Sequence, residues 1–364
     1  MAAGLMADGV SLRVARSVAA AEHALLRRRG DTVVMLRHRT RAFRFLHPHT
    51  WGFMLSNAIV RRLQLLVAIT LFVGPLTLRA QADSVGNSYP SRCGAAATPR
   101  DPGRYTPLPR GDVFCPLIAD PKAIRSFVTY QRGDASDFAA DIAAVGIGDQ
   151  FGFFRVAGNA PGDGVQLGIS GAVFAQFDIA SPSIDLLNAD YVLALPLTFR
   201  RGGFSGRARV YHQSSHLGDE LLLRPEPPVR ENLSFEATDL VLSMDVGPVR
   251  AYGGGEYFFG RDPVSLPEGL AHGGLELRPA ASARFGTIAL ARPVAGVDVK
   301  AVNDSTWRFG VSVRAGLEFG RPRETGLAGR RWSLLAEFYD GPSPYGQFRR
   351  SHIRLTGLGF HFTL

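Results

Sequence analysis

The sequence predicts an all-β protein, an antiparallel transmembrane β-barrel of about 12 strands that follows a signal peptide and an irregular segment. Three features indicate this fold: long stretches that alternate apolar and polar residues, aromatic residues near the ends of these stretches, and connections that alternate between tight turns and longer loops. Strands that cross an outer membrane are about ten residues long and have an apolar outer face, a polar lumenal face and aromatic girdles. A soluble β-sandwich also alternates, but its strands are typically about 5–6 residues long.

The excess positive charge lies entirely in the first part of the chain. The formal net charge is +9, and residues 1–82 contain 12 arginines, no lysine and 3 acidic residues. Residues 83–364 contain 29 basic and 29 acidic residues. Since this larger part has no basic stripe that could neutralise phosphates, we expect no nucleic-acid partner.

Residues 54–82 have the layout of a secretory signal peptide. Two arginines precede a largely apolar stretch (63–73), and AQA (80–82) is a small-residue cleavage site. The apolar stretch is shorter than the about 20 residues of a membrane-spanning helix. We therefore expect export by the general secretion route to the bacterial outer membrane. Because such signals stand at the N-terminus, residues 1–53 are interpreted as a wrongly assigned gene start or a leader extension.

Residues 83–122 are rich in Pro, Gly, Arg and Asp and show no periodicity, which predicts an irregular periplasmic segment. This segment could also plug the periplasmic mouth of the barrel. It contains both cysteines, Cys93 and Cys115, which are a candidate disulfide in an oxidising compartment. Such a disulfide would contribute roughly 3 kcal/mol on the loop-entropy model. Two unpaired thiols are the alternative.

Residues 123–364 are predicted to form the barrel. In 165–179, for example, apolar and small residues from Val165 onward share one face, while Gln166, Ser170 and Asp178 share the other. An even strand number needs one more outward strand than the eleven clear segments provide, and 124–132 is the candidate. The eleven segments are 143–156, 165–179, 190–200, 203–214, 233–246, 248–260, 270–278, 291–302, 306–320, 330–340 and 351–364.

Charged residues of both signs are predicted to face the lumen. Opposite charges could brace and close the interior, which we favour, or line a narrow pore. These residues are Asp190, Arg200, Arg207, Arg209, Arg250, Glu256, Glu276, Arg278, Asp298, Lys300, Arg308, Arg314, Glu318, Arg331 and Glu337.

The last strand, "GLGFHFTL" (357–364), resembles the terminal signal by which outer-membrane barrels are recognised for insertion. The resemblance implies the barrel-assembly machinery as a partner, together with outer-membrane lipid. Leu364 departs from the usual terminal aromatic residue, and an ordinary last strand is the alternative.

Several stretches, among them "FCPLIADPKAIRSFVTYQ" (114–131), "YGGGEYFF" (252–259) and "YDGPSPYGQF" (339–348), resemble a bacterial family catalogued as domain of unknown function 1207. The resemblance covers about 114–364. It implies an exported, β-rich protein and leaves the activity open, because no activity is assigned to the family.

The stretch "YHQSSHLGDELLLR" (211–224) contains the candidate catalytic residues. His212 and Ser214 share a face with Ala208 and Val210, so they point toward lipid, where unsatisfied polar groups are costly. "YHQS" resembles the His-x-Ser signature of outer-membrane phospholipase A and the lipid A deacylase, whose His and Ser act as base and nucleophile on the outside of the barrel.

The resemblance implies that Asn232 or Glu236 orients the imidazole of His212. A simple antiparallel register places Asn232 opposite Ser214 and Ser234 opposite His212, with Glu236 one pair further down. The sequence departs from the phospholipase pattern after the serine, where Ser215-His216 replaces Asn-Gly. A polar rim at the end of a strand is the alternative to a catalytic group.

Three hypotheses about function follow. The first, which we favour from sequence, is an outer-membrane barrel with a structural or binding role. The second is a lipid esterase that uses Ser214, and the third is a narrow passive channel. We expect no cofactor and no metal site; substrate and oligomeric state stay open.

Overall fold

The computed structural model describes residues 103–135, 141–160, 162–279, 283–285, 289–304, 306–320 and 331–363. Residues 1–53, which were interpreted from sequence, the predicted signal peptide (54–82) and Cys93 lie outside the described residues. Within the described ranges, no helix is long and apolar enough to cross a bilayer.

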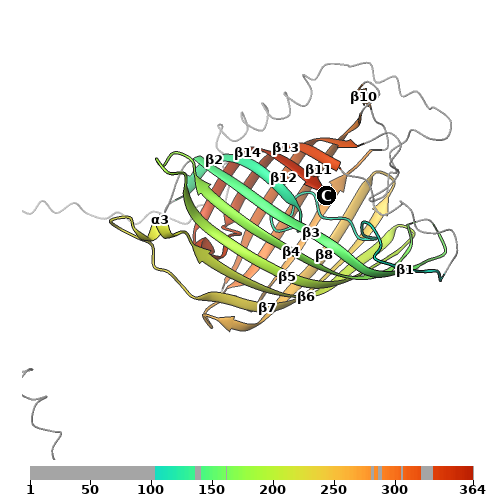
Figure 1. The fold of residues 1–364 in the computed structure, drawn as a ribbon, viewed down its shortest axis with the longest axis horizontal. Helices are drawn as coiled ribbons and strands as arrows, with labels where there is room; N and C mark the ends of the chain where they lie inside the picture. The colour runs from blue at the N-terminus through green and yellow to red at the C-terminus, as the bar shows by residue number, and fades with distance from the viewer. Residues whose placement is uncertain are drawn as a thin grey trace, which may run out of the picture. The chain divides into compact units, whose positions relative to one another are not determined.

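Twelve antiparallel strands form a closed barrel, because each pairs with the next and β14 pairs with β2 (Figure 1). The predicted twelve strands are confirmed, including the one proposed at 124–132. The wall consists of β2 (Ser126–Ala135), β3 (Asp141–Ala157), β4 (Gly164–Asp178), β5 (Asp185–Arg201), β6 (Phe204–Leu217), β7 (Leu233–Val246), β8 (Val249–Asp262), β9 (Gly269–Leu277), β11 (Ala289–Asp304), β12 (Thr306–Gly320), β13 (Arg331–Pro342) and β14 (His352–Thr363).

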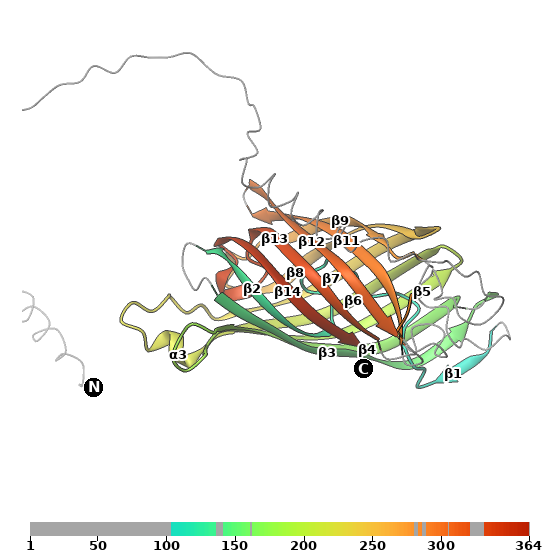
Figure 2. The same ribbon diagram turned by 90° about the horizontal axis from the view of Figure 1, so that it is seen from above.

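Four short elements do not belong to this ring of strands. β1 (Tyr105–Pro107) pairs with β3, and β10 (Ala283–Phe285) pairs with β11. The helix α3 (Asp219–Leu222) lies in the loop 218–232, and the 3₁₀ turn η1 (Gly346–Phe348) lies in the loop 343–351. We call the barrel end with these two loops the loop end; β1 lies at the opposite, turn end (Figure 2).

The two faces of the wall have opposite polarity. In β4 every second side chain is buried in the lumen, including the amides of Gln166 and Gln176, while Val165 on the outside is exposed. All fifteen charged residues predicted for the lumen are buried or half-buried. The exterior carries exposed Leu, Val, Phe and Trp side chains instead, as a surface in contact with lipid requires.

Aromatic side chains gather near the strand ends on the outside. Near the turn end, the ring of Trp332 stacks on Phe319 with centroids 3.9 Å apart and lies 5.5 Å from Phe360. Near the loop end, Trp307 and Tyr257 are exposed. These positions agree with interfacial girdles at both membrane surfaces.

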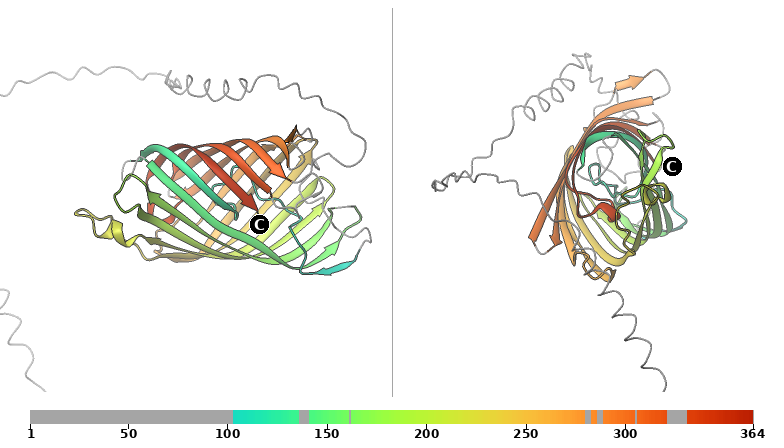
Figure 3. Two further views of the ribbon diagram at one scale, coloured as in Figure 1. Left: turned by 45° about the horizontal axis from the view of Figure 1, so that its top comes forward. Right: turned by 90° about the vertical axis from the view of Figure 1, so that its left-hand side faces the viewer.

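The part of the chain before β2 passes through the barrel. Residues 110–125, which we call the lumenal segment, run inside the ring of strands when the barrel is viewed end-on (Figure 3). Five buried arginines that surround the segment donate hydrogen bonds to its main-chain carbonyls. The bonds join Arg155 to Gly111 (2.9 Å), Arg200 to Val113 (2.8 Å), Arg250 to Cys115 (3.1 Å), Arg278 to Pro116 (3.3 Å) and Arg314 to Ile118 (3.1 Å).

Cys115 lies in this segment. It is completely buried and is not a free thiol. Because Cys93 lies outside the described residues, the pairing of the two cysteines stays a prediction.

Two reciprocal ion pairs fix the middle of the lumenal segment, and they use the only two lysines of the chain. Asp120 of the segment lies 2.8 Å from the wall residue Lys300, and Lys122 of the segment pairs with Asp190 of β5. Burial raises the pKa of Asp120, but the Lys300 ammonium, the neighbouring His272 and the hydrogen bonds from Lys300 and Lys122 together lower it more. The pKa of this carboxyl therefore lies well below its usual range. Asp120 is therefore ionised and holds its partner in place.

The loop 343–351 folds into the barrel from the loop end. The N–H of Gly346 donates to Asp190 at 3.2 Å, and the amide of Gln347 donates to the carbonyls of Ser215 (2.7 Å) and Glu231 (3.0 Å). The Tyr345 ring lies 4.5 Å from the Lys122 ammonium. Loop and lumenal segment therefore meet inside the barrel.

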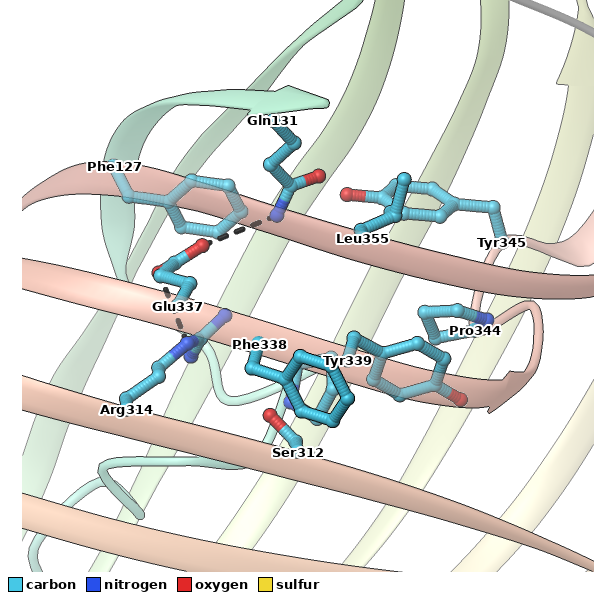
Figure 4. A pocket seen from close by; sticks show the side chains of 11 residues that line it. Phe127, Gln131, Ser312, Arg314, Glu337, Phe338, Tyr339, Pro344, Tyr345 and Leu355 are labelled. Carbon is cyan, nitrogen blue, oxygen red and sulfur yellow. Dashed lines mark hydrogen bonds and ion pairs between the residues drawn. The ribbon is translucent and has the colours of Figure 1, made fainter. Parts of the chain in front are cut away.

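A small cavity is left where they meet, lined by Pro121, Phe127, Arg314, Glu337 and Tyr345 among others (Figure 4). Glu337 accepts a hydrogen bond from Gln131 (3.1 Å) and pairs with Arg314 (2.9 Å). The cavity measures about 30 Å³, which is room for about two water molecules.

The substitution Asp120→Asn should destabilise the barrel, because it leaves the buried Lys300 ammonium without its counter-ion. We expect a loss of about 3–5 kcal/mol in the free energy of unfolding, measured by urea titration in detergent micelles. Glu268→Gln is the control, since the carboxylate of Glu268 is exposed and 3.6 Å from Arg261, and it should change stability by less than about 1 kcal/mol. Equal effects of the two variants would contradict a stabilising role of the Asp120–Lys300 ion pair.

The reconstituted wild-type protein should show no stable current steps in planar bilayers. The lumenal segment and the loop 343–351 fill the interior, and a cavity for about two waters is not a continuous path for ions. Single-channel recording at several voltages tests this expectation, with a known open porin as the positive control. Reproducible unitary steps would contradict a filled lumen.

Candidate active site

His212 and Ser214 lie on the outer face of β6, near the loop end. Tyr211 and Ser215, their chain neighbours, are buried in the lumen, so the alternate residues must point outward. The His212 side chain is 50% exposed, whereas Ser214 is half-buried. The predicted outward direction of both side chains agrees with the structure.

Glu236 of β7 lies directly opposite His212, and Ser234 lies opposite Ser214. The predicted register, with Asn232 opposite Ser214 and Ser234 opposite His212, is wrong by two residues. The reason is that β6 continues to Leu217 and the loop 218–232 forms its own turn at α3, so the hairpin does not close where a simple count places it. A shift of two keeps every side chain on its face.

The shift brings a carboxylate to the imidazole. His212 Nδ1 lies 3.0 Å from Glu236 Oε1, which is a normal hydrogen-bond distance. A carboxylate that accepts from one ring nitrogen fixes the tautomer and leaves the other nitrogen free to accept a proton. His212 Nε2 is thus the nitrogen available to Ser214.

Ser214 is the neighbour of His212 on the same strand face. Residues two apart along a strand are about 6.7 Å apart. Within the described part of the chain, the Ser214 hydroxyl has no hydrogen bond, to His212 or to any other group. In enzymes without substrate the bond between nucleophile and base is often long, so the arrangement is compatible with a nucleophile that awaits substrate.

Asn232 does not join this group. Its amide donates to Asp262 Oδ2 at 2.6 Å, beyond the end of β7. Of the four candidate residues, the structure brings His212 and Glu236 into contact, places Ser214 beside them and leaves Asn232 bound to the neighbouring strand.

A β-bulge in β8 makes room for the Glu236 carboxylate. The β7–β8 register shifts between Ser234 and Glu236, so β8 has one extra residue at this point. Gly260 lies in the bulge with a φ of +55°, and a Cβ at this position would lie 2.0 Å from Glu236 Oε2. The left-handed backbone favours glycine at this position, and any side chain here would displace the Glu236 carboxylate. Sequence reasoning missed this feature, although an isolated glycine in a strand indicates a bulge.

The group lies at a boundary between two kinds of surface. Leu193 pairs with His212 on one side and Val210 precedes it, and both are more than half exposed. Toward the loop end the residues are polar, and the Tyr191 ring contacts the His216 ring edge-on at 5.7 Å. A carboxylate on the lipid-facing side of a barrel is destabilising, and its cost falls toward the membrane interface.

A second cluster of potential ligands lies in the lumen. Atoms of Asp239, Glu256 and His272 lie within 4.8 Å of one another. However, Arg207 and Arg209 both pair with Asp239, at 3.1 and 3.4 Å. Because these guanidinium groups already neutralise the carboxylate, the cluster fits a metal ion poorly.

The family model described as protein of unknown function (DUF1207) matches residues 95–364. The chain belongs to this family. Membership agrees with the resemblance seen in the sequence and leaves the activity of DUF1207 proteins open. No curated protein matches the sequence significantly.

Among solved structures, outer-membrane phospholipase A from Escherichia coli is 14% identical, with a TM-score of 0.45 over 66% of this chain and 96% of that one. A calcium-bound dimer of the Salmonella typhi phospholipase is 13% identical, with a TM-score of 0.45 over 67% and 93%. The KdgM porin is 8% identical, with a TM-score of 0.35 over 65% and 98%. The barrel fold of the DUF1207 protein follows from the closed strand pairing of its own chain. Its activity must likewise be argued from its own residues.

The substitution Gly260→Ala should break the contact between His212 and Glu236, because the added methyl group would occupy the position of the carboxylate. NMR of histidine ring nitrogens should show that His212 loses its single tautomer. Gly253→Ala is the matched control on the same strand, since its Cβ would come no closer than 3.9 Å to a neighbour. An unchanged His212 spectrum in the Gly260 variant would rule out the predicted crowding.

Proposed function

We propose that this DUF1207 protein is a serine esterase that hydrolyses acyl esters of membrane lipids on the outside of its barrel. Ser214 is the nucleophile, His212 the general base and Glu236 the group that orients the imidazole. The observation that carries the proposal is the 3.0 Å contact between His212 and Glu236 on a lipid-facing surface beside Ser214.

Each step of the reaction uses groups on this surface. His212 Nε2 takes the Ser214 proton while the serine oxygen attacks the ester carbonyl carbon. The imidazolium then protonates the leaving alcohol oxygen as the ester C–O bond breaks, which leaves an acyl-serine. Water attacks that acyl group, again with His212 as base, and releases the fatty acid and free Ser214. Glu236 stabilises the imidazolium in both halves.

The alternative of a purely structural barrel explains the site less well. A structural rim needs polar residues beyond the hydrocarbon, but it does not need a paired carboxylate and a bulge with a left-handed glycine to receive it. Bulges are enriched next to active sites for this reason. The channel hypothesis has no support from a lumen that the chain itself fills.

The proposal fixes the orientation of the barrel. The loop end faces the cell exterior and the turn end the periplasm, after export by the general secretion route and insertion by the barrel-assembly machinery. The reacting ester then belongs to a lipid of the outer leaflet, whose carbonyl lies at the border between headgroups and acyl chains.

The substitution Ser214→Ala should abolish fatty-acid release from phospholipid in mixed micelles, with a loss of about 10⁴-fold or more in kcat. Ser234→Ala is the matched control, because Ser234 lies opposite Ser214 on the next strand and is equally half-buried. A fluorophosphonate probe should label the wild type and the Ser234 variant but not the Ser214 variant.

Three outcomes would contradict the proposal. They are no hydrolysis of any lipid ester by the wild type, full activity of Ser214→Ala, or equal losses in the two serine variants. Glu236→Gln separates catalysis from folding, because it should lower kcat by about 10²-fold or more while the detergent-resistant barrel fold is kept.

A further inference from the structure

The outer face of β6 below Ser214 carries small side chains between larger ones. From His212 toward the turn end, the outward residues are Val210, Ala208 and Gly206. Leu197 of β5 and Leu240 of β7 are the cross-strand partners of Ala208. Both leucines are about half exposed, so the small Ala208 side chain is a low point between them. Nearer to His212, Val210 lies between Leu195 and Thr238 along the same strip of outward β6 residues.

The strip is closed at Gly206. A Cβ at this glycine would lie 2.4 Å from Phe199 and 2.9 Å from Leu242, so these two side chains already lean over β6 from both sides. The Phe199 ring also packs on Phe204, with centroids 5.5 Å apart. The strip therefore begins at the catalytic group and ends at an apolar barrier.

Its length matches one lipid tail. Six residues separate Ser214 from Ala208, which is about 20 Å along a strand. With a strand tilt of about 40°, this is about 15 Å of depth. Half of the hydrocarbon core is also about 15 Å thick. An extended chain whose ester carbonyl lies at Ser214 thus reaches Ala208.

We infer that this strip binds one acyl chain of the lipid substrate and that Ala208, with Phe199 and Leu242, sets the chain length that fits. The inference rests on the proposed function, since it takes Ser214 as the position of the ester. It identifies the substrate as a lipid that enters sideways from the membrane with its tail along β6.

The first test measures chain-length preference. Rates are compared for esters that differ only in acyl length, in one detergent, for the wild type, Ala208→Leu and Ala251→Leu. Ala251 is an exposed alanine on the outer face of β8, two strands away, and serves as the control. We expect the ratio of long-chain to short-chain rates to fall about 10-fold in the Ala208 variant and to stay at the wild-type value in the Ala251 variant.

A second measurement does not depend on hydrolysis. A phospholipid with a photoactivatable group at the end of its tail is reconstituted with the Ser214→Ala protein, and cross-linked peptides are mapped. Cross-links concentrated at 206–210 of β6, relative to 249–257 of β8, are expected. Even labelling around the barrel would overturn the inference, and so would protein–protein cross-links at β6, which would indicate a second barrel there.

The two tests separate the two levels of the proposal. Loss of activity in Ser214→Ala with an unchanged ratio in Ala208→Leu would overturn the acyl strip alone. A wild type that hydrolyses no ester would overturn the proposed function, and the cross-linking pattern would then decide whether β6 still binds a lipid tail.

Discussion

The pairing of β14 with β2 is the constraint on which the whole structure depends. A sheet surrounded by hydrocarbon cannot leave main-chain N–H and C=O groups unpaired, so it must close on itself. Closure leaves each wall residue only two directions, toward lipid or toward the lumen. The outward placement of His212 and Ser214 and the inward placement of the charged residues are therefore consequences of one alternation.

That alternation also decides what the sequence can predict. Strands repeat every two residues, so alternation marked eleven strands, the lumenal charges from Asp190 to Glu337, and the outward His212 and Ser214. The twelfth strand followed from the even number that a barrel requires. Parity contains no information about register. The pairing of His212 with Glu236 depends on the path of the loop 218–232, and the space for the carboxylate depends on one extra residue at Gly260. Both are tertiary features.

The path of the lumenal segment through the barrel could not be predicted from sequence, for a different reason. Five arginines hold the lumenal segment by its main-chain carbonyls, and every residue has such a carbonyl, so the segment needs no recognisable motif. The irregular composition of a segment can suggest that it forms a plug, but it does not predict the path of the segment through the barrel. The two lysines were the one indication in the sequence. The chain has no other lysine, and both form ion pairs that join the lumenal segment to the wall.

The two faces of this barrel treat charge in opposite ways. Inside, carboxylates such as Asp239 are neutralised by more than one cation, which rigidifies the wall. Outside, the Glu236 carboxylate has one hydrogen-bond partner, the imidazole of His212. Ser214 lies beside this pair on the strand of His212, and its hydroxyl has no hydrogen-bond partner among the described residues. The proposed esterase therefore places the reaction on the outer face of β6, while the ion pairs of the interior hold the fold.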